Sequence, residues 1–186
     1  MSWLWVVFTL LAAAGQTVRN AMQRELTATL GTAGATHVRF LFGFPFAIVF
    51  LVVVMLAIGQ ALPQPGPIFW PWVLFGALAQ ILATALMLMA MSDRSFVVTI
   101  AYIKTEAVQA AVFGLIFLGD PVTLSMVVAI VVATAGVVLM SFKGGAPVQG
   151  GLRPTLIGLA AGGAFALSAT GYRGAILALA HPNFVL

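Results

Sequence analysis

Six long apolar runs constrain this chain more than any other feature of its sequence. The first run starts near Trp3, and the others cover Val38–Ile58, Phe69–Met91, Phe96–Leu118, Val122–Phe142 and Thr155–Leu179. Each is close to the ~20 residues that an α-helix needs to cross the core of a bilayer. The runs are continuously apolar and too long for the ~10-residue alternating strands of a membrane barrel. The sequence therefore predicts an all-α, polytopic membrane helix bundle.

The composition supports a membrane location. Only 6% of the residues are charged, whereas soluble globular proteins have about 25%. A soluble fold of 186 residues could not bury a sequence that is 62% hydrophobic. No Lys or Arg precedes the first apolar run, so we interpret that run as a retained helix and not as a cleaved signal peptide. We expect a multi-pass protein of the cytoplasmic (inner or plasma) membrane.

Several classes of function lack their sequence signatures. The chain has no cysteine, and its net charge of +4 comes without a basic run, so thiolate sites and nucleic-acid binding are not expected. The sequence contains no HExxH or GxSxG motif and no nucleotide-binding loop. We therefore expect neither an enzyme nor an ATP-driven pump, with no catalytic residues, no cofactor and no metal site. The expected partners are the lipid bilayer and a small-molecule substrate, and no oligomeric state is indicated.

A short internal repeat suggests two related units. The segment Ala12–Met22 aligns with Ala166–Ile176, and Arg19 then falls on Arg173, 154 positions later. A unit of five helices crosses the membrane an odd number of times, so its second copy is inverted. We expect residues 1–150 to form a first five-helix repeat and residues 151–186 to supply the first helix of a second repeat. On this interpretation the native polypeptide is longer and completes the second repeat.

Two segments resemble a known family. The segment Phe113–Ser141 is similar to the junction between the fourth and fifth helices of EamA-type transporters, in the drug/metabolite transporter superfamily. The matching positions there are Leu118, Gly119, Thr123 and Gly136, while Asp120 and Ala129 replace the usual Glu and Gly. The segment His37–Pro45 is similar to the second helix of the family, which opens with an arginine at the position of Arg39.

The resemblance implies a fold and a function. Members of this family usually have ten helices in two inverted halves and move small metabolites or amino acids. That layout agrees with the offset of the internal repeat.

Two charged residues, Lys104 and Glu106, lie near the middle of the fourth apolar run. Each costs roughly 2.5–3.5 kcal/mol at the centre of a membrane helix, so such charges mark functional sites by default. Residues two apart on a helix face about 200° away from each other, so a mutual salt bridge is not expected. Glu106 instead shares a face with Thr99, Tyr102 and Gln109, which predicts a polar stripe along a cavity. Lys104 then faces another helix, for transport or for structural pairing.

The end of the first run carries Arg19, Asn20 and Gln23. These residues fit either an interfacial position, since Arg24 and Glu25 follow, or a carboxylate clamp built on the planar fork of arginine. The match of Arg19 to Arg173 favours the clamp. The predicted substrate and ion pathway consists of Glu106, Lys104, Arg19, Gln109, Tyr102 and Arg173.

Three further positions have simpler interpretations. Gly158 and Gly162 form a small-xxx-small pair, which is typical of close helix packing. Gln80 faces inward from the third run or pairs with a neighbour, and the sequence does not choose between these.

The positively charged loops predict one orientation and the resemblance predicts the other. The charges on one side of the predicted bundle are Arg24, Arg39, Arg94, Lys143 and Arg153. The positive-inside rule therefore places the N-terminus outside. Many ten-helix members of the family have the reverse orientation, so the sidedness stays open.

The residues taken together predict a secondary transporter, either an exporter or a permease, of small polar metabolites such as amino acids. Protons are a candidate coupling ion, because a carboxyl group such as Glu106 in a site of low dielectric constant can exchange a proton during transport. The alternative is a membrane scaffold or assembly subunit that transports nothing.

Overall fold

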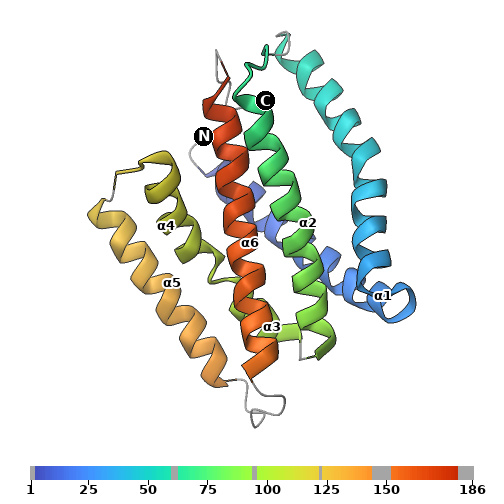
Figure 1. The fold of residues 1–186 in the computed structure, drawn as a ribbon, viewed down its shortest axis with the longest axis vertical. Coiled ribbons are helices and arrows are strands. Elements are labelled where there is room, and N and C mark those ends of the chain that lie inside the picture. Colours follow the sequence, from blue (N-terminus) through green and yellow to red (C-terminus); the bar gives the residue numbers. More distant parts are fainter. Residues whose placement is uncertain (1–2, 60–62, 94–95, 122, 144–151, 180–186) are drawn as a thin grey trace.

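The computed structural model describes residues 3–59, 63–93, 96–121, 123–143 and 152–179 (Figure 1). Nearly all of them are helical, in α1 (Leu4–Ile58), α2 (Phe69–Asp93), α3 (Phe96–Ile103), α4 (Glu106–Leu118), α5 (Leu124–Lys143) and α6 (Leu152–Leu177). The prediction of an all-α membrane helix bundle is confirmed.

The described helices have the length and composition of membrane spans. Four stretches are long and apolar enough to cross a bilayer, and they lie in α1, in α2, across α3 and α4, and in α6. Residues Leu124–Gly136 of α5 form a shorter apolar stretch. Large apolar side chains such as Phe8, Phe46 and Leu124 are exposed on the outside of the bundle. Such a surface suits contact with lipid and not with water.

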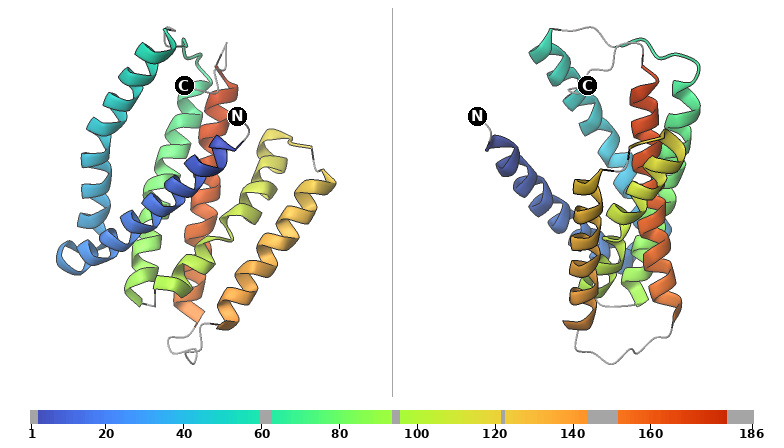
Figure 2. Two further views of the ribbon diagram at one scale, coloured as in Figure 1. Left: turned by 180° about the vertical axis from the view of Figure 1, so that it is seen from behind. Right: turned by 90° about the vertical axis from the view of Figure 1, so that its left-hand side faces the viewer.

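The helix α1 bends sharply at Gly31. The backbone there has φ 68° and ψ 174°, a conformation that glycine adopts far more readily than other residues. The bend divides α1 into a first arm (residues 4–30) and a second arm (32–58), which diverge from it as in Figure 2. The arms correspond to the first two predicted spans. The first arm stays helical through residues 15–26, the segment that carries Arg19, Asn20 and Gln23.

The helices α2 and α6 pack side by side at the centre of the bundle (Figures 1 and 2). A Cβ atom on Gly171 would lie 2.8 Å from the Cα of Gly76, and one on Gly174 would lie 2.6 Å from the ring of Trp72. The hydroxyl of Ser168 donates a hydrogen bond to the carbonyl of Gly76, over 2.9 Å. Small residues and a hydroxyl therefore hold these two backbones close together.

The fourth predicted span is broken between α3 and α4, so the prediction of a continuous helix was wrong at this point. The N–H of Thr105 donates to the carbonyl of Tyr102, three residues back, and the Thr105 hydroxyl donates to the same oxygen over 2.7 Å. The N–H groups of Val108 and Gln109 then both donate to the carbonyl of Thr105. The Thr105 side chain competes with the regular backbone ladder, which interrupts the helix.

The break lies against the glycines of α6. A Cβ atom on Gly158 would be 3.0 Å from that of Tyr102, and one on Gly162 would be 3.0 Å from the carbonyl oxygen of Ile103. The predicted packing role of these two glycines is confirmed. Their lack of side chains lets the irregular backbone between α3 and α4 approach α6 closely.

Candidate functional site

A partly open cavity of about 470 Å³ lies inside the bundle, between both arms of α1 and the helices α2, α3, α4 and α6. The polar side chains that matter most in its lining are Arg19, Arg39, Gln80, Lys104, Glu106 and Tyr172. Three of them are cations and one is a carboxylate, and they come from both arms of α1, from the break after α3 and from α4. Within the described residues, the four charged side chains of this cavity belong to segments that are otherwise largely apolar.

The break between α3 and α4 changes the relation of Lys104 to Glu106. On an uninterrupted helix these residues would face nearly opposite ways, as the sequence predicted. In the structure both line the same cavity. The prediction that Lys104 faces away from Glu106 was therefore wrong, because it assumed a regular helix through Thr105.

Glu106 occupies the first turn of α4. The N-terminus of a helix carries a partial positive charge, which favours a carboxylate at that position. Glu106 is half-buried, whereas Lys104 is exposed. The broken helix thus presents a helix N-terminus, a carboxylate and an ammonium group to one cavity, an arrangement typical of transporters with discontinuous helices.

The two arginines of the cavity are held by neutral partners. Arg19 donates to the side-chain oxygen of Asn20 over 3.5 Å, and Arg39 donates to the side-chain oxygen of Gln23 over 3.2 Å. Asn20 and Gln23 are each only 7% exposed, and the side-chain nitrogen of Gln23 has no partner among the described residues. Because Gln23 belongs to the first arm of α1 and Arg39 to the second, their bond joins the arms across the bend at Gly31.

The predicted stripe of Thr99, Tyr102, Glu106 and Gln109 does not form a single face. The hydroxyl of Thr99 is buried and donates to the carbonyl of Ala90, 3.2 Å away on α2. The amide of Gln109 donates to the Thr105 hydroxyl over 2.9 Å and to the carbonyl of Leu159 on α6 over 3.3 Å. The helical register is interrupted after Ile103, so residues on the two sides of the break turn to different neighbours. Of these four residues, only Glu106 is among the lining residues of the cavity.

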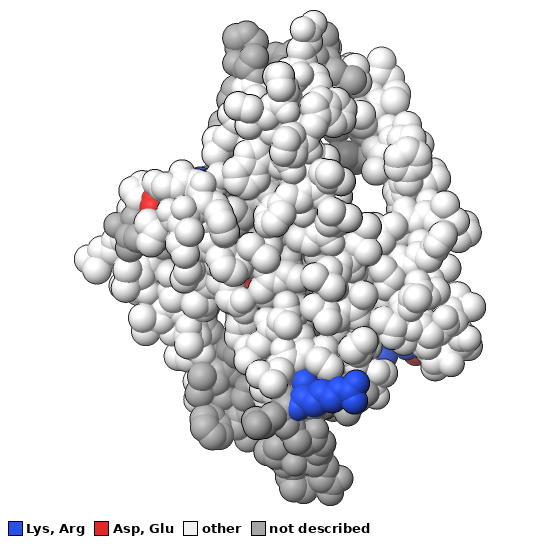
Figure 3. Space-filling model, in the orientation of Figure 1, with Lys and Arg blue, Asp and Glu red and all other residues white. Residues whose placement is uncertain are grey.

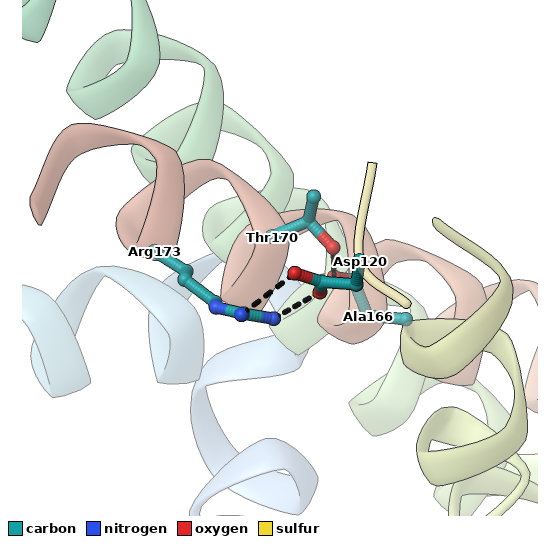
Figure 4. Close-up of polar contacts among 4 residues, drawn as sticks. All are labelled: Asp120, Ala166, Thr170 and Arg173. Carbon is teal, nitrogen blue, oxygen red and sulfur yellow. Dashed lines mark hydrogen bonds and ion pairs between the residues drawn. The ribbon is translucent and has the colours of Figure 1, made fainter. Parts of the chain in front are cut away.

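Arg173 lies in different surroundings from Arg19. Both of its terminal nitrogens donate to the carboxylate of Asp120, at the turn between α4 and α5, and one bond measures 2.8 Å (Figure 4). Gly119 ends α4 with φ 67°. A Cβ atom on Gly114 would lie 2.7 Å from a carboxylate oxygen of Asp120. Arg173 is not among the residues that line the cavity, although the adjacent Tyr172 is.

Sequence reasoning missed part of this cavity. It left Gln80 open between two roles, although Gln80 lines the cavity. It did not select Tyr172, which also lines the cavity and lies next to Arg173 in the aligned segment. Arg39 was assigned to the family pattern or to the loop charges, and it too lines the cavity. The break could have been suspected from three consecutive polar residues, Lys104 to Glu106, because a threonine followed by an acidic residue in the first turn is typical of the start of a helix.

Part of the positive charge on the outer surface lies at one end of the bundle. In Figure 3 the Lys and Arg surface is concentrated near the start of α6 and below the bend of α1. Arg24 and Arg153 are exposed at these places. Arg94 and the loop after Lys143 fall outside the residues that the structure describes, so the count of positive charges on this side is not tested further.

Comparison with known families gives the identity of the chain. The model of the EamA-like transporter family matches residues 3–142, which is most of the sequence. The chain belongs to the EamA-like transporter family. The resemblance stated from the helix junction and from Arg39 is thereby confirmed, and the family consists of membrane transporters of small molecules. Neither the curated proteins nor the solved structures gave a match to this EamA-like chain.

Proposed function

We propose that this EamA-like protein is a secondary transporter of small polar metabolites such as amino acids, acting in the cytoplasmic membrane. The observation that carries the proposal is the cavity of about 470 Å³, lined by four charged side chains among apolar helices. Intramembrane charges are costly, and they are usually retained where they face a substrate or ion pathway. A protein that only held other subunits together would gain nothing from leaving these charges around an open cavity.

The predicted pathway residues take two kinds of role in this proposal. Arg19, Lys104 and Glu106 line the cavity and face the substrate. Gln109 and Tyr102 act indirectly, because they contact α6 beside the break that brings Lys104 and Glu106 together. Arg173 fixes α6 to the turn after α4 through Asp120.

The proposal includes proton coupling and an internal repeat. Glu106 is the carboxylate of the cavity, so it is the candidate to bind and release a proton during transport. Residues 1–150 form the first repeat and residues 151–186 contain the first helix of an inverted second repeat. The alignment of Arg19 with Arg173 supports this division.

Flux measured in vesicles tests the proposal against the scaffold alternative. The purified full-length protein is reconstituted, and uptake of labelled amino acids and organic acids is followed with and without a proton gradient. Accumulation above that of protein-free vesicles is expected for at least one solute. The absence of flux for every solute in both directions would favour the scaffold.

A further inference from the structure

The charges that line the cavity do not balance. Arg19, Arg39 and Lys104 contribute three positive charges, and Glu106 contributes one negative charge. The other titratable group in the lining is the phenol of Tyr172. With Glu106 ionised, the cavity therefore carries two uncompensated positive charges at membrane depth, where each unpaired charge is costly.

Among the described residues, no carboxylate is paired with Arg19 or Arg39. Their hydrogen-bond partners are the neutral side-chain oxygens of Asn20 and Gln23. The ion pair of the described residues joins Arg173 to Asp120, outside the cavity lining. A bound anion would supply the negative charge that these two guanidinium groups lack.

Two features of the fold direct these charges at one place. The bend at Gly31 brings Arg19 from the first arm of α1 and Arg39 from the second arm to the same cavity. The break before Glu106 adds the N-terminus of α4, whose partial charge is positive. Planar guanidinium groups bind carboxylates and phosphates through paired hydrogen bonds.

We propose that the substrate is a small organic molecule of net negative charge, and that its oxyanion group binds between Arg19 and Arg39. Gln23 acts as a positioning residue, since its side-chain oxygen holds the guanidinium of Arg39 while its own nitrogen has no partner within the part of the chain that the structure describes. Lys104 and Glu106 face the remainder of the substrate. This inference rests on the proposed transport function and narrows its substrates from polar metabolites to anions.

Equilibrium binding to the purified full-length protein tests the inference. Four solutes are compared in detergent by calorimetry: succinate, its neutral diamide, glycerol phosphate and the zwitterion alanine. Succinate or glycerol phosphate is expected to bind at least about tenfold more tightly than the diamide and alanine, since a charged hydrogen-bond pair accounts for that difference. The ratio between succinate and glycerol phosphate shows whether the site favours carboxylate or phosphate. Equal binding of alanine or the diamide would overturn the inference without any variant.

Substitutions then locate the anion. Arg19→Gln and Arg39→Gln are each expected to weaken binding of the better anion roughly 10- to 100-fold. Arg153→Gln is the matched control, because Arg153 is an exposed arginine outside the cavity lining. Arg39→Lys keeps the charge without the planar fork and should lose less affinity than Arg39→Gln. Unchanged affinity in folded Arg39→Gln protein would overturn the assignment.

Flux of the same solutes separates this inference from the proposed function. Transport of alanine without binding of either anion would overturn the anion site and leave the transporter standing. Binding of succinate or glycerol phosphate without any flux would leave the anion site and overturn the transporter.

Discussion

The cavity and the turn between α4 and α5 both hold arginine side chains, but these are satisfied in different ways. At the turn, Arg173 makes two hydrogen bonds to the carboxylate of Asp120, and the pair is neutral (Figure 4). In the cavity, Arg19 and Arg39 donate hydrogen bonds to the neutral oxygens of Asn20 and Gln23, and among the described residues neither is paired with a carboxylate. A neutral pair stabilises the fold and has no charge left for a ligand. An arginine without a carboxylate partner lowers the stability of the fold, and it can bind a carboxylate of the substrate instead.

The largest effect is expected for Glu106→Gln, which removes the carboxylate of the cavity. We expect this change to abolish flux driven by a proton gradient, because an amide cannot carry a proton across the membrane. Exchange of substrate without net proton movement should survive. Binding of the anion should stay the same or become tighter, because a negative charge leaves the cavity. Vesicle flux with an imposed pH gradient, together with counterflow, measures both properties.

The control for this experiment is Glu25→Gln, since Glu25 is an exposed carboxylate of the first arm outside that cavity. It should transport as the unmodified protein does. A Glu106→Gln protein that kept the original rate and pH dependence of flux would refute the proton-carrier role.

The next effect comes from giving a cavity arginine the kind of partner that Arg173 has. Gln23→Glu places a carboxylate 3.2 Å from a nitrogen of Arg39, at the present position of the amide oxygen. We expect anion affinity to fall about tenfold, because the new ion pair neutralises Arg39. Thermal stability should be kept or increased, since the side chain has the same size and the pair is charge-balanced. Calorimetric binding and a detergent melting curve measure the two effects.

Gln64→Glu serves as the matched control, because Gln64 is exposed in the segment between α1 and α2. It adds the same charge away from the cavity and should leave binding unchanged. If Gln23→Glu bound anions as well as the original protein, Arg39 would not be part of the site.

A smaller effect is expected at the paired arginine. Arg173→Gln and Asp120→Asn should each lower the free energy of unfolding, and the double variant should lose less than the sum. The side chain of Arg173 is 55% exposed and that of Asp120 is 19% exposed, so we expect a coupling energy of about 0.5–1 kcal/mol for this pair. Anion binding should change little. A coupling near zero, or a large loss of anion binding in Arg173→Gln, would remove the distinction between the two regions.

Local sequence features predicted the parts of this fold that depend on local chemistry. Apolar runs of membrane length gave the helices, because the bilayer demands internally bonded spans. The pair Gly158 and Gly162 was predicted to pack helices, and this prediction follows from the missing side chains. Each of these conclusions requires only neighbours in the sequence or a helical spacing.

The features that sequence could not supply depend on distant neighbours. Asp120 and Arg173 are 53 positions apart, so their pairing is visible only once α6 lies beside the turn. The break at Thr105 has a local cause in the bond of its hydroxyl to the carbonyl of Tyr102, and a distant contact accompanies it, since Gln109 binds the carbonyl of Leu159 on α6. A regular helix was expected from the apolar run, and on that helix Lys104 and Glu106 faced apart. The interrupted helix instead places both at one cavity.

The smallest expected effect isolates the ion pair without changing any charge, in Gly114→Ala. Alanine inside α4 raises helix propensity by about 1 kcal/mol relative to glycine. Its Cβ atom would lie 2.7 Å from a carboxylate oxygen of Asp120, closer than such atoms approach, so the carboxylate must leave its present position beside Arg173. The gain in propensity and the weakened pair oppose each other, so we expect a net change in the free energy of unfolding of about 1 kcal/mol or less.

The informative measurement is therefore the coupling between Asp120 and Arg173 in the Gly114→Ala background. The coupling should fall toward zero, because the methyl group of alanine would displace the carboxylate of Asp120. Gly136→Ala is the matched control, since a Cβ atom on Gly136 of α5 meets no neighbour within 4 Å, and it should keep the full coupling. Anion binding should be unaffected by either alanine, because the cavity cations do not depend on this pair. Undiminished coupling in Gly114→Ala would mean that the ion pair tolerates a shifted carboxylate. The contact of Asp120 with Gly114 would then not be needed for its pairing with Arg173.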